Sequence, residues 1–318
     1  MKGLPLHEWD DFADLVRVVS VEHGVTPGMV EKDYWVVQCL KAIQALGWEV
    51  HFKGGTSLSK GFGILQRFSE DLDLKLEPDE DWRLPADHNW KSEGKKALRD
   101  RERFFDGLVR ALVVPGCRVR EEVRDPRCRS IGLRVEYPVA TDGPPPPLTP
   151  GVLLEIGHAR VTPAVVRPIV SWVAEYVRRD ESGLAGCDLD PAQVPCVLPA
   201  VTLLEKLDAI CRRYPSGRDA AAFVRHYEDA AAIVKYLTDS GTTSPEEVRL
   251  LYAEMREAGD IRSFGADSEG LALANPTRNA ELEKAWRAAE GLHWGRRLRL
   301  DDCAEVVREY LRSAGIGV

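Results

Sequence analysis

The stretch that decides the fold is residues 51–76, which read HFKGGTSLSKGFGILQRFSEDLDLKL. A short apolar strand pattern runs into the glycine turn at 53–57, and the residues after the turn can continue as a helix. Glycine lets the backbone approach an anion closely, and the free N–H groups of a first helical turn point toward that anion. The pattern therefore predicts a phosphate-binding site, which we call the phosphate seat.

Two aspartates follow this turn. Residues 68–76 alternate with a period of two, so Leu72 and Leu74 face one side of a strand while Asp71 and Asp73 face the other. Two carboxylates a few ångströms apart repel each other unless a cation lies between them. Because hard oxygen ligands beside a phosphate seat suit Mg²⁺, we predict a site for Mg²⁺, or for Mn²⁺, on Asp71 and Asp73.

Composition bounds the class of protein. The chain has 318 residues, of which 44% are hydrophobic, and no run approaches the roughly 18 apolar residues of a membrane span. Seven scattered cysteines without a C-x-x-C pair argue against a disulfide framework or a zinc site. We expect a soluble cytoplasmic protein without a membrane partner. A net charge of -8 argues against non-specific coating of duplex DNA, but it allows a nucleic-acid end in a local basic patch.

The pattern along the chain predicts an α+β fold. Helical spacing marks 7–23, the residues after Thr26 and 97–112, whereas alternation marks strands over 118–122 and 131–137. From about residue 190 the pattern becomes helical throughout. We expect a domain over 1–190 with a mixed sheet flanked by helices, and an all-helical half over 191–318 that completes an active-site cleft.

Two charged features interrupt apolar segments. Glu155 lies in the otherwise apolar strand pattern 152–157, where a lone carboxylate is costly unless it is paired or coordinates a metal. It is a candidate third metal ligand, and the alternative is an edge-strand residue that faces water. The stretch 31–34, EKDY, interrupts the apolar face of the second helix, and its simplest interpretation is a solvated patch with a local Glu/Lys pair.

Several motifs together resemble one family. The residues that carry the resemblance are KGGTSLSK at 53–60, SEDLDL at 69–74, LLEKL at 203–207, RHYED at 225–229 and the EKDY stretch. They are similar to the AbiEii-type nucleotidyltransferase toxins of type IV toxin–antitoxin systems, including the MenT-like toxins, within the DNA polymerase β-like superfamily.

The resemblance implies an activity and partners. It implies transfer of a nucleoside monophosphate from an NTP to an acceptor with release of pyrophosphate. In the better understood relatives this acceptor is the 3′ end of tRNA, so that translation is blocked. It also implies a cognate antitoxin, with or without direct binding.

The resemblance also implies roles for residues of this chain. Lys206 would neutralise charge on the leaving pyrophosphate. Asp229 would orient Lys206 or the base, and the alternative is a helical pair with Arg225. The implied catalytic residues are Asp71, Asp73, Lys206 and Asp229. The implied nucleotide contacts are Gly54, Gly55, Thr56, Ser57, Lys60, Ser69 and Lys206. The implied metal ligands are Asp71 and Asp73, to which the strand pattern adds Glu155 as the candidate third ligand.

Competing functions remain open. A P-loop phosphotransferase is set aside, because Lys60 precedes Gly61 and neither Ser nor Thr follows it. A nucleotidyltransferase that acts on a small molecule or a protein would share the same catalytic parts, and a non-catalytic nucleotide-binding module would keep the fold without turnover. A basic groove from 124–134 together with Arg296, Arg297 and Arg299 would favour RNA.

Overall fold

The structure, a computed structural model, describes residues 3–69, 71–77, 84, 88–146, 148–158, 160–180, 186–295 and 297–317. Glu70 and Arg296, which belong to the predictions above, lie outside these residues. The chain divides into two compact units. Unit one comprises Met1–Phe62 and Ser69–Cys196, and unit two comprises Gly63–Phe68 and Val197–Val318. The chain therefore leaves unit one after the glycine turn and returns to it just before the aspartates.

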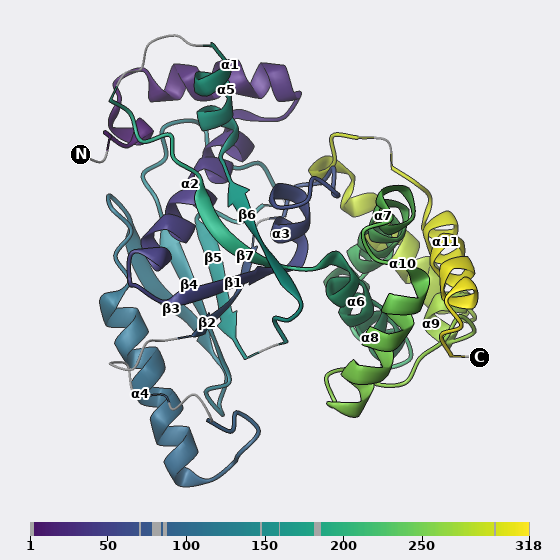
Figure 1. The fold of residues 1–318 in the computed structure, drawn as a ribbon. Helices are drawn as coiled ribbons and strands as arrows, with labels where there is room; N and C mark the ends of the chain where they lie inside the picture. The colour runs from purple at the N-terminus through teal and green to yellow at the C-terminus, as the bar shows by residue number, and fades with distance from the viewer. Residues whose placement is uncertain are drawn as a thin grey trace. The chain divides into compact units, whose positions relative to one another are not determined.

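Unit one is built on a mixed seven-stranded sheet with the order β3-β4-β5-β2-β1-β7-β6 (Figure 1). Strand β2 pairs with β5 in parallel and with β1 antiparallel, so the strand that carries both aspartates lies inside the sheet. The strands are β1 (Glu49–Lys53), β2 (Asp71–Glu77), β3 (Arg118–Arg124), β4 (Ser130–Glu136), β5 (Val152–Gly157), β6 (Ala164–Ile169) and β7 (Ala192–Val197).

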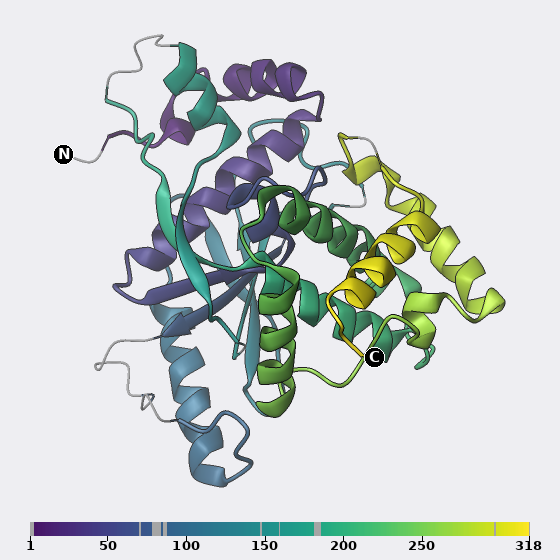
Figure 2. The same ribbon diagram turned by 45° about the vertical axis from the view of Figure 1, so that its right-hand side comes forward.

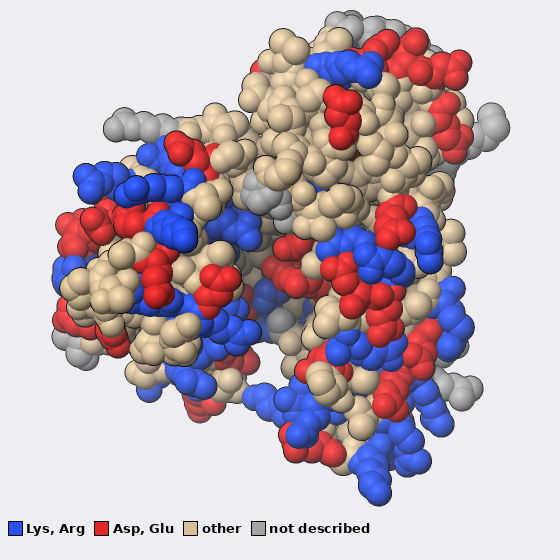
Figure 3. All heavy atoms as spheres, turned by 180° about the vertical axis from the view of Figure 1, so that it is seen from behind, with Lys and Arg blue, Asp and Glu red and all other residues tan. Residues whose placement is uncertain are grey.

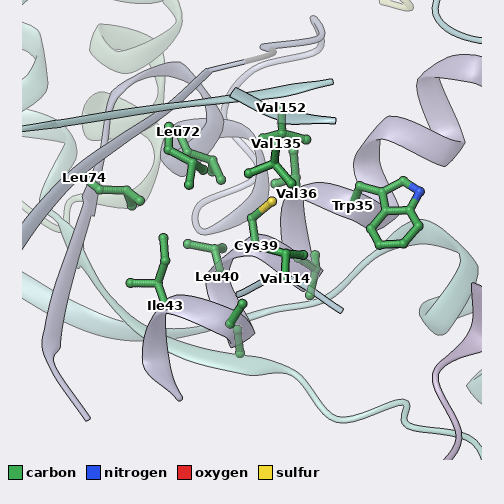
Figure 4. Packing of buried hydrophobic residues seen from close by; sticks show 14 of the residues in the cluster. Trp35, Val36, Cys39, Leu40, Ile43, Leu72, Leu74, Val114, Val135 and Val152 are labelled. Atoms are coloured by element: carbon green, nitrogen blue, oxygen red, sulfur yellow. The ribbon is translucent and has the colours of Figure 1, made fainter. Parts of the chain in front are cut away.

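One face of this sheet is apolar and is covered by helix α2 (Pro27–Gln44). The period of two sends Leu72 and Leu74 of β2 to this face, where they are 0% and 3% exposed. Figure 4 shows the packing of this layer, with the labelled residues of the sheet and of α2 in one cluster. These labelled residues are Trp35, Val36, Cys39, Leu40, Ile43, Leu72, Leu74, Val114, Val135 and Val152. The burial of these side chains sets the strand register and so directs Asp71 and Asp73 to the opposite face.

Four further α-helices complete the described part of unit one. Helix α1 (Phe12–His23) ends at Gly24, whose φ of 64° provides a left-handed C-cap, and it packs with α5 (Trp172–Asp180) against α2. Helix α4 (Lys95–Ala111) buries Phe104, Phe105 and Leu108 on one side. The short helix α3 (Gly54–Lys60) follows β1 directly. The expected helical continuation to Ile64 ends at Lys60, because the chain there crosses into unit two.

The EKDY stretch of α2 is buried, and its interpretation as a solvated patch is wrong. Glu31 and Lys32 are both 0% exposed. The Glu31 carboxylate accepts hydrogen bonds from the main-chain N–H groups of Ala140 (2.6 Å) and Thr141 (3.2 Å), and Lys32 Nζ donates to the carbonyl of Thr149 (2.6 Å). The stretch holds the connection between β4 and β5 from inside the unit, because these partners offset the cost of burying its charges.

Unit two is helical. Helices α6 (Pro199–Arg213) and α7 (Arg225–Ser240) pack together, and α7 also packs on α11 (Leu300–Ser313), as both ribbon views show (Figures 1 and 2). The other helices of this unit are α8 (Pro245–Glu257), α9 (Glu269–Ala272) and α10 (Pro276–Ala288). The segment 63–68 belongs to the same unit, since Phe68 N–H donates to the Leu292 carbonyl (2.8 Å) and Trp294 N–H donates to the Gln66 carbonyl (3.1 Å).

The predicted fold class is confirmed, with a mixed sheet flanked by helices and a helical second half of the chain. Two segments depart from the predicted organisation: residues 63–68 pack with the helical unit, and β7 (Ala192–Val197), expected in the all-helical half, pairs with β1 in the sheet of unit one. Among the described helices, none combines the length and apolar character needed to cross a bilayer.

Candidate active site

Asp73 and Glu155 lie side by side in a row of polar residues across unit one's sheet. In the parallel pairing of β2 with β5, Asp73 is the register partner of Glu155. In the antiparallel pairing of β1 with β2, Asp73 is the partner of Lys53. Asp71, two residues before Asp73, points to the same face. Three carboxylates thus share one face, with Lys53 beside them. We name Asp71, Asp73 and Glu155 the acidic row.

Glu155 lies on an interior strand and not at an edge. The alternative was an edge-strand glutamate that faces water. The structure contradicts the edge position, but it shows that Glu155 is exposed to solvent. Partial desolvation of its carboxyl group, the charges of Asp73 and Asp71 and a hydrogen bond with Asp73 together raise the pKa of Glu155 to about 7. A raised pKa in a group of neighbouring carboxylates indicates charge repulsion that a bound cation would relieve.

The donor set fits a hard divalent cation. Carboxylate oxygens from Asp71, Asp73 and Glu155 are the ligand type that Mg²⁺ and Mn²⁺ prefer. Within the described ranges, no group of three or more His, Cys, Asp or Glu side chains is already arranged as a metal site. The three carboxylates are therefore neighbours that share a face without being drawn together as ligands.

Gly54 is the point where the glycine turn touches the acidic row. Its φ of 76° lies in the left-handed region, and a Cβ added there would lie 2.0 Å from Asp73 Oδ2. Any other residue would both strain the backbone and displace the carboxylate. Gly54 thus allows the first turn of α3 to start directly against Asp73, which explains why the glycines and the aspartates occur as a pair of motifs.

The Thr56 hydroxyl has structural partners, and the Ser57 hydroxyl is buried without a hydrogen-bond partner among the described residues. Thr56 Oγ1 donates to the main-chain carbonyls of Ser69 (3.1 Å) and Asp71 (2.7 Å), which ties α3 to the start of β2. Thr56 and Ser57 are 3% and 1% exposed. In this conformation, contact with a phosphate would therefore come from the main-chain N–H groups at Gly54 and Gly55 and not from the two hydroxyls.

Lys60 at the end of α3 is held inside unit one. Its Nζ forms an ion pair with Asp33 Oδ1 and lies 5.3 Å from the centre of the Trp172 ring. Asp33 Oδ2 also accepts a hydrogen bond from the Trp172 N–H (2.8 Å). Because this lysine's charge is balanced by a buried carboxylate, the structure gives it a role in holding α3 on α2 and α5. A contact of Lys60 with a nucleotide remains only a prediction.

Unit two contains a second charged cluster, formed by Lys206, Asp229 and Arg67. Lys206 Nζ of α6 lies 2.6 Å from Asp229 Oδ2 of α7. Arg67 forms a two-pronged pair with the same carboxylate, with Nε 2.7 Å from Oδ1 and Nη2 2.7 Å from Oδ2. Asp229 is 0% exposed and Lys206 is 8% exposed. The cluster holds two cations for one carboxylate, so it keeps a net positive charge.

Electrostatics hold Asp229 ionised. Burial alone would raise the pKa of this carboxyl group, but the charges of Arg67 and Lys206 and the hydrogen bonds from both outweigh burial and hold the pKa well below its usual range. Nearby His226 shows the opposite response: burial, followed by the charge of Lys206, lowers its pKa well below the usual value. The imidazole is therefore neutral beside a positive cluster.

The structure brings Asp229 onto Lys206, one of the two roles that the resemblance implied. The Asp229 carboxylate accepts hydrogen bonds from Lys206 and Arg67, so the alternative of a simple helical pair with Arg225 does not account for this residue.

Arg67 is a member of this charged cluster that no motif in the sequence indicated. The residue precedes the aspartate strand, but the segment 63–68 carries it into unit two, where it is 4% exposed. One signal was present, because Arg67 stands beside Phe68 and close to Ile64 and Leu65. A lone charge among apolar residues implies a buried partner, by the same argument that singled out Glu155.

Several described arginines of the predicted basic groove have acidic partners, and the groove stays a prediction. Arg124 pairs with Glu121 (2.6 Å) and Asp106 (2.8 Å), and Arg134 pairs with Glu122 (2.6 Å). Arg127 and Arg129 both pair with Glu93, and in unit two Arg297 pairs with Glu228 and Arg299 with Asp301. These arginines are balanced by the carboxylates that surround them.

Comparisons with known proteins agree with the motifs. The family described as "Nucleotidyl transferase AbiEii toxin, Type IV TA system" matches residues 38–300 of this chain. Among solved structures, the chain is similar to MenT4, the nucleotidyltransferase toxin Rv2826c from Mycobacterium tuberculosis H37Rv, with 16% identity and a TM-score of 0.45 over 93% of this chain and 99% of that one. A comparison with curated protein sequences finds no significant match. The family match spans most of the sequence and includes both charged clusters, and the chain therefore belongs to the AbiEii family of nucleotidyltransferase toxins of type IV toxin–antitoxin systems.

Proposed function

We propose that this protein transfers a nucleoside monophosphate from an NTP to the 3′ end of tRNA, and that it thereby blocks translation. The observation that carries the proposal is the acidic row, with Asp73 beside Glu155 and against Gly54, in a chain of the AbiEii family. In the reaction, a terminal hydroxyl group of the RNA loses its proton to water, and its oxygen bonds to the α-phosphorus of the NTP. The bond from that phosphorus to the bridging oxygen breaks, and pyrophosphate leaves with the bonding electron pair.

Each residue has a role in the proposal. Asp71 and Asp73, with Glu155 as a third ligand, hold Mg²⁺ or Mn²⁺, which when bound supplies positive charge at phosphate oxygens. The main-chain N–H groups at the start of α3 take a phosphate, and Gly54 lets that phosphate approach closely.

The cluster of unit two has a different task. Lys206 neutralises negative charge that grows on the leaving pyrophosphate. Asp229 and Arg67 are positioning residues, because they hold the Lys206 amino group in one place and are themselves buried. The neutral His226 beside them adds no charge of its own.

A labelling assay tests the proposal. Purified protein with MgCl₂, each of the four α-labelled NTPs and total tRNA should label RNA. Asp73→Asn should lower the rate about 1000-fold, which is the size of a lost electrostatic contribution at a reacting phosphate. Glu136→Gln is the matched control, because Glu136 lies in the same sheet and pairs with Arg120. Expression of the wild type should arrest growth, and expression of Asp73→Asn should not.

The assay separates the competing functions. Equal labelling by wild type and Asp73→Asn would refute the metal assignment. Labelling that appears only with a small molecule or a protein as acceptor would replace tRNA as the substrate. NTP binding without transfer to any acceptor would identify a non-catalytic nucleotide-binding module.

A further inference from the structure

Helix α4 presents a basic face that the proposed reaction does not use. Lys95, Arg99, Arg103 and Arg110 are all exposed. At 3.6 residues per turn, these four positions fall within a sector of about 80° around the helix axis. With a rise of 1.5 Å per residue they form a stripe about 22 Å long. We name these four residues the α4 stripe.

Among the residues that the structure describes, none of the four side chains of the α4 stripe forms an ion pair with a carboxylate. Asp106 falls within the same sector of α4, where it pairs with Arg124 (2.8 Å), and Asp100 beside the sector pairs with Lys96 (2.9 Å). Glu102 borders the stripe at one edge. The stripe thus leaves a local excess of positive charge on a protein whose net charge is -8.

The opposite side of α4 is buried against the rest of unit one. Phe105 and Leu108 are 0% exposed, and the buried Arg101 donates to the carbonyls of Arg127 (2.9 Å) and Ser92 (3.0 Å). Because these contacts hold the helix in place, they also fix the arrangement of its charged face. Figure 3 shows Lys and Arg side chains gathered at the lower right, the end of the molecule where α4 lies.

We propose that the α4 stripe binds the phosphate backbone of the RNA acceptor. This inference rests on the proposed transfer to RNA and extends it with a surface that holds the body of the acceptor. A row of cations along one helix face complements the regular negative charge of a nucleic-acid strand, and such contacts position the acceptor without reading its sequence.

The test measures RNA binding separately from chemistry. Labelled total tRNA is titrated with the full-length protein without NTP, over a range of KCl concentrations, and binding is followed by fluorescence anisotropy. The variant Lys95→Gln/Arg99→Gln/Arg103→Gln/Arg110→Gln should reduce the salt slope of log K by about 3, because each lost phosphate contact contributes about 0.7 to 0.9. At 0.1 M KCl the affinity should fall about 100-fold or more.

A matched variant controls for net charge. Arg120→Gln/Arg127→Gln/Arg129→Gln/Arg179→Gln removes the same number of charges from arginines that already have acidic partners away from α4. It should weaken RNA binding far less than the stripe variant. Both variants should keep the wild-type circular dichroism spectrum and NTP affinity, which shows that the fold and the site of unit one are intact.

Several outcomes would overturn the inference. Equal tRNA affinity of wild type and stripe variant would do so, and so would equal losses in the two charge-matched variants. If the stripe variant instead lost binding only to vesicles that contain phosphatidylglycerol, the surface would be a membrane contact. None of these outcomes affects NTP-dependent labelling by the Asp71/Asp73 site, so failure of this inference and failure of the proposed function are distinguishable.

Discussion

Glu155 in unit one and Asp229 in unit two are both acidic residues to which the motifs gave a role, yet their pKa values move in opposite directions. Desolvation and the charges of Asp73 and Asp71 raise the pKa of Glu155 to about 7. The charges of Arg67 and Lys206 outweigh burial and lower the pKa of Asp229. The first carboxylate lies among like charges, and the second lies among opposite charges.

The difference shows what each cluster can do. Excess negative charge on an exposed sheet face is relieved by a cation from solution, so unit one is suited to take up a metal ion. A buried carboxylate with two cationic partners needs no further ligand, so Asp229 acts within the fold and holds Lys206. We therefore propose a metal-binding role for the cluster of unit one and a positioning role for that of unit two.

Breaking the cluster of unit two should have the largest effect on stability. Asp229→Ala leaves Arg67 and Lys206 buried without their carboxylate, and we expect a loss of about 3–5 kcal/mol in the free energy of unfolding. Urea denaturation in EDTA at pH 7 measures this loss. Asp73→Ala is the control in unit one, and it should be neutral or slightly stabilising because it removes repulsion. A comparable loss for both variants would remove the distinction between the clusters.

The close approach of Gly54 to Asp73 predicts a smaller effect on stability and a large one on activity. Gly54→Ala should cost about 1–3 kcal/mol through the positive φ. It should also abolish nucleotide transfer, because the new methyl group displaces the Asp73 carboxylate. Gly47→Ala is the matched control, since Gly47 has a φ of 80° but nothing within 4 Å of its added Cβ. Both the urea midpoint and the labelling rate are measured for each variant.

The outcome sharpens the role of the glycine turn. Equal loss of stability in the two variants, with activity lost only in Gly54→Ala, supports contact with Asp73 as the reason for this glycine. Full activity of Gly54→Ala would show that the carboxylate can move without consequence.

We expect the smallest effect at Glu155, in the dependence of stability on pH. Its folded pKa of about 7 lies above the usual 4.5, so the folded state binds more protons than the unfolded state between these values. Stability should therefore fall as pH rises from 4.5 through 7, and Glu155→Gln should flatten this dependence. Because the side chain is exposed, solvent screening keeps the effect small. Thermal midpoints in EDTA between pH 4.5 and 8 measure it.

A metal ion provides the complementary measurement. At pH 8 added MgCl₂ should raise the thermal midpoint of the wild type more than that of Glu155→Gln, because a ligand that binds only the folded state stabilises it. Asp229 has the opposite pH dependence: its depressed pKa makes its contribution complete above the usual 3.8 and lost as pH falls below that value. A thermal midpoint of the wild type that rose between pH 4.5 and 7 relative to that of Glu155→Gln would contradict the raised pKa of Glu155.

Much of the fold could be predicted from local patterns. The period of two in 71–76 placed the aspartates on the polar face of a strand, and the spacing in 97–112 predicted a helix that the structure gives as α4. Strands β6 and β7 and helix α5 were not predicted. The register that makes β5 an interior strand depends on pairing with β2 and β4, which no local pattern specifies.

What the sequence by itself determined is the pair of motifs, the two aspartates on one strand face and the family that these motifs indicate. These features depend on local spacing, because side chains two residues apart on a strand share a face wherever the strand lies. Only the tertiary structure decided which charges are balanced. It buried EKDY, paired Lys60 with Asp33, placed Arg67 on Asp229 and set Glu155 beside Asp73. The physical reason is that the state of a charge depends on the burial and partners that distant segments supply, and pairing across 162 positions, as between Arg67 and Asp229, leaves no periodic trace in the sequence.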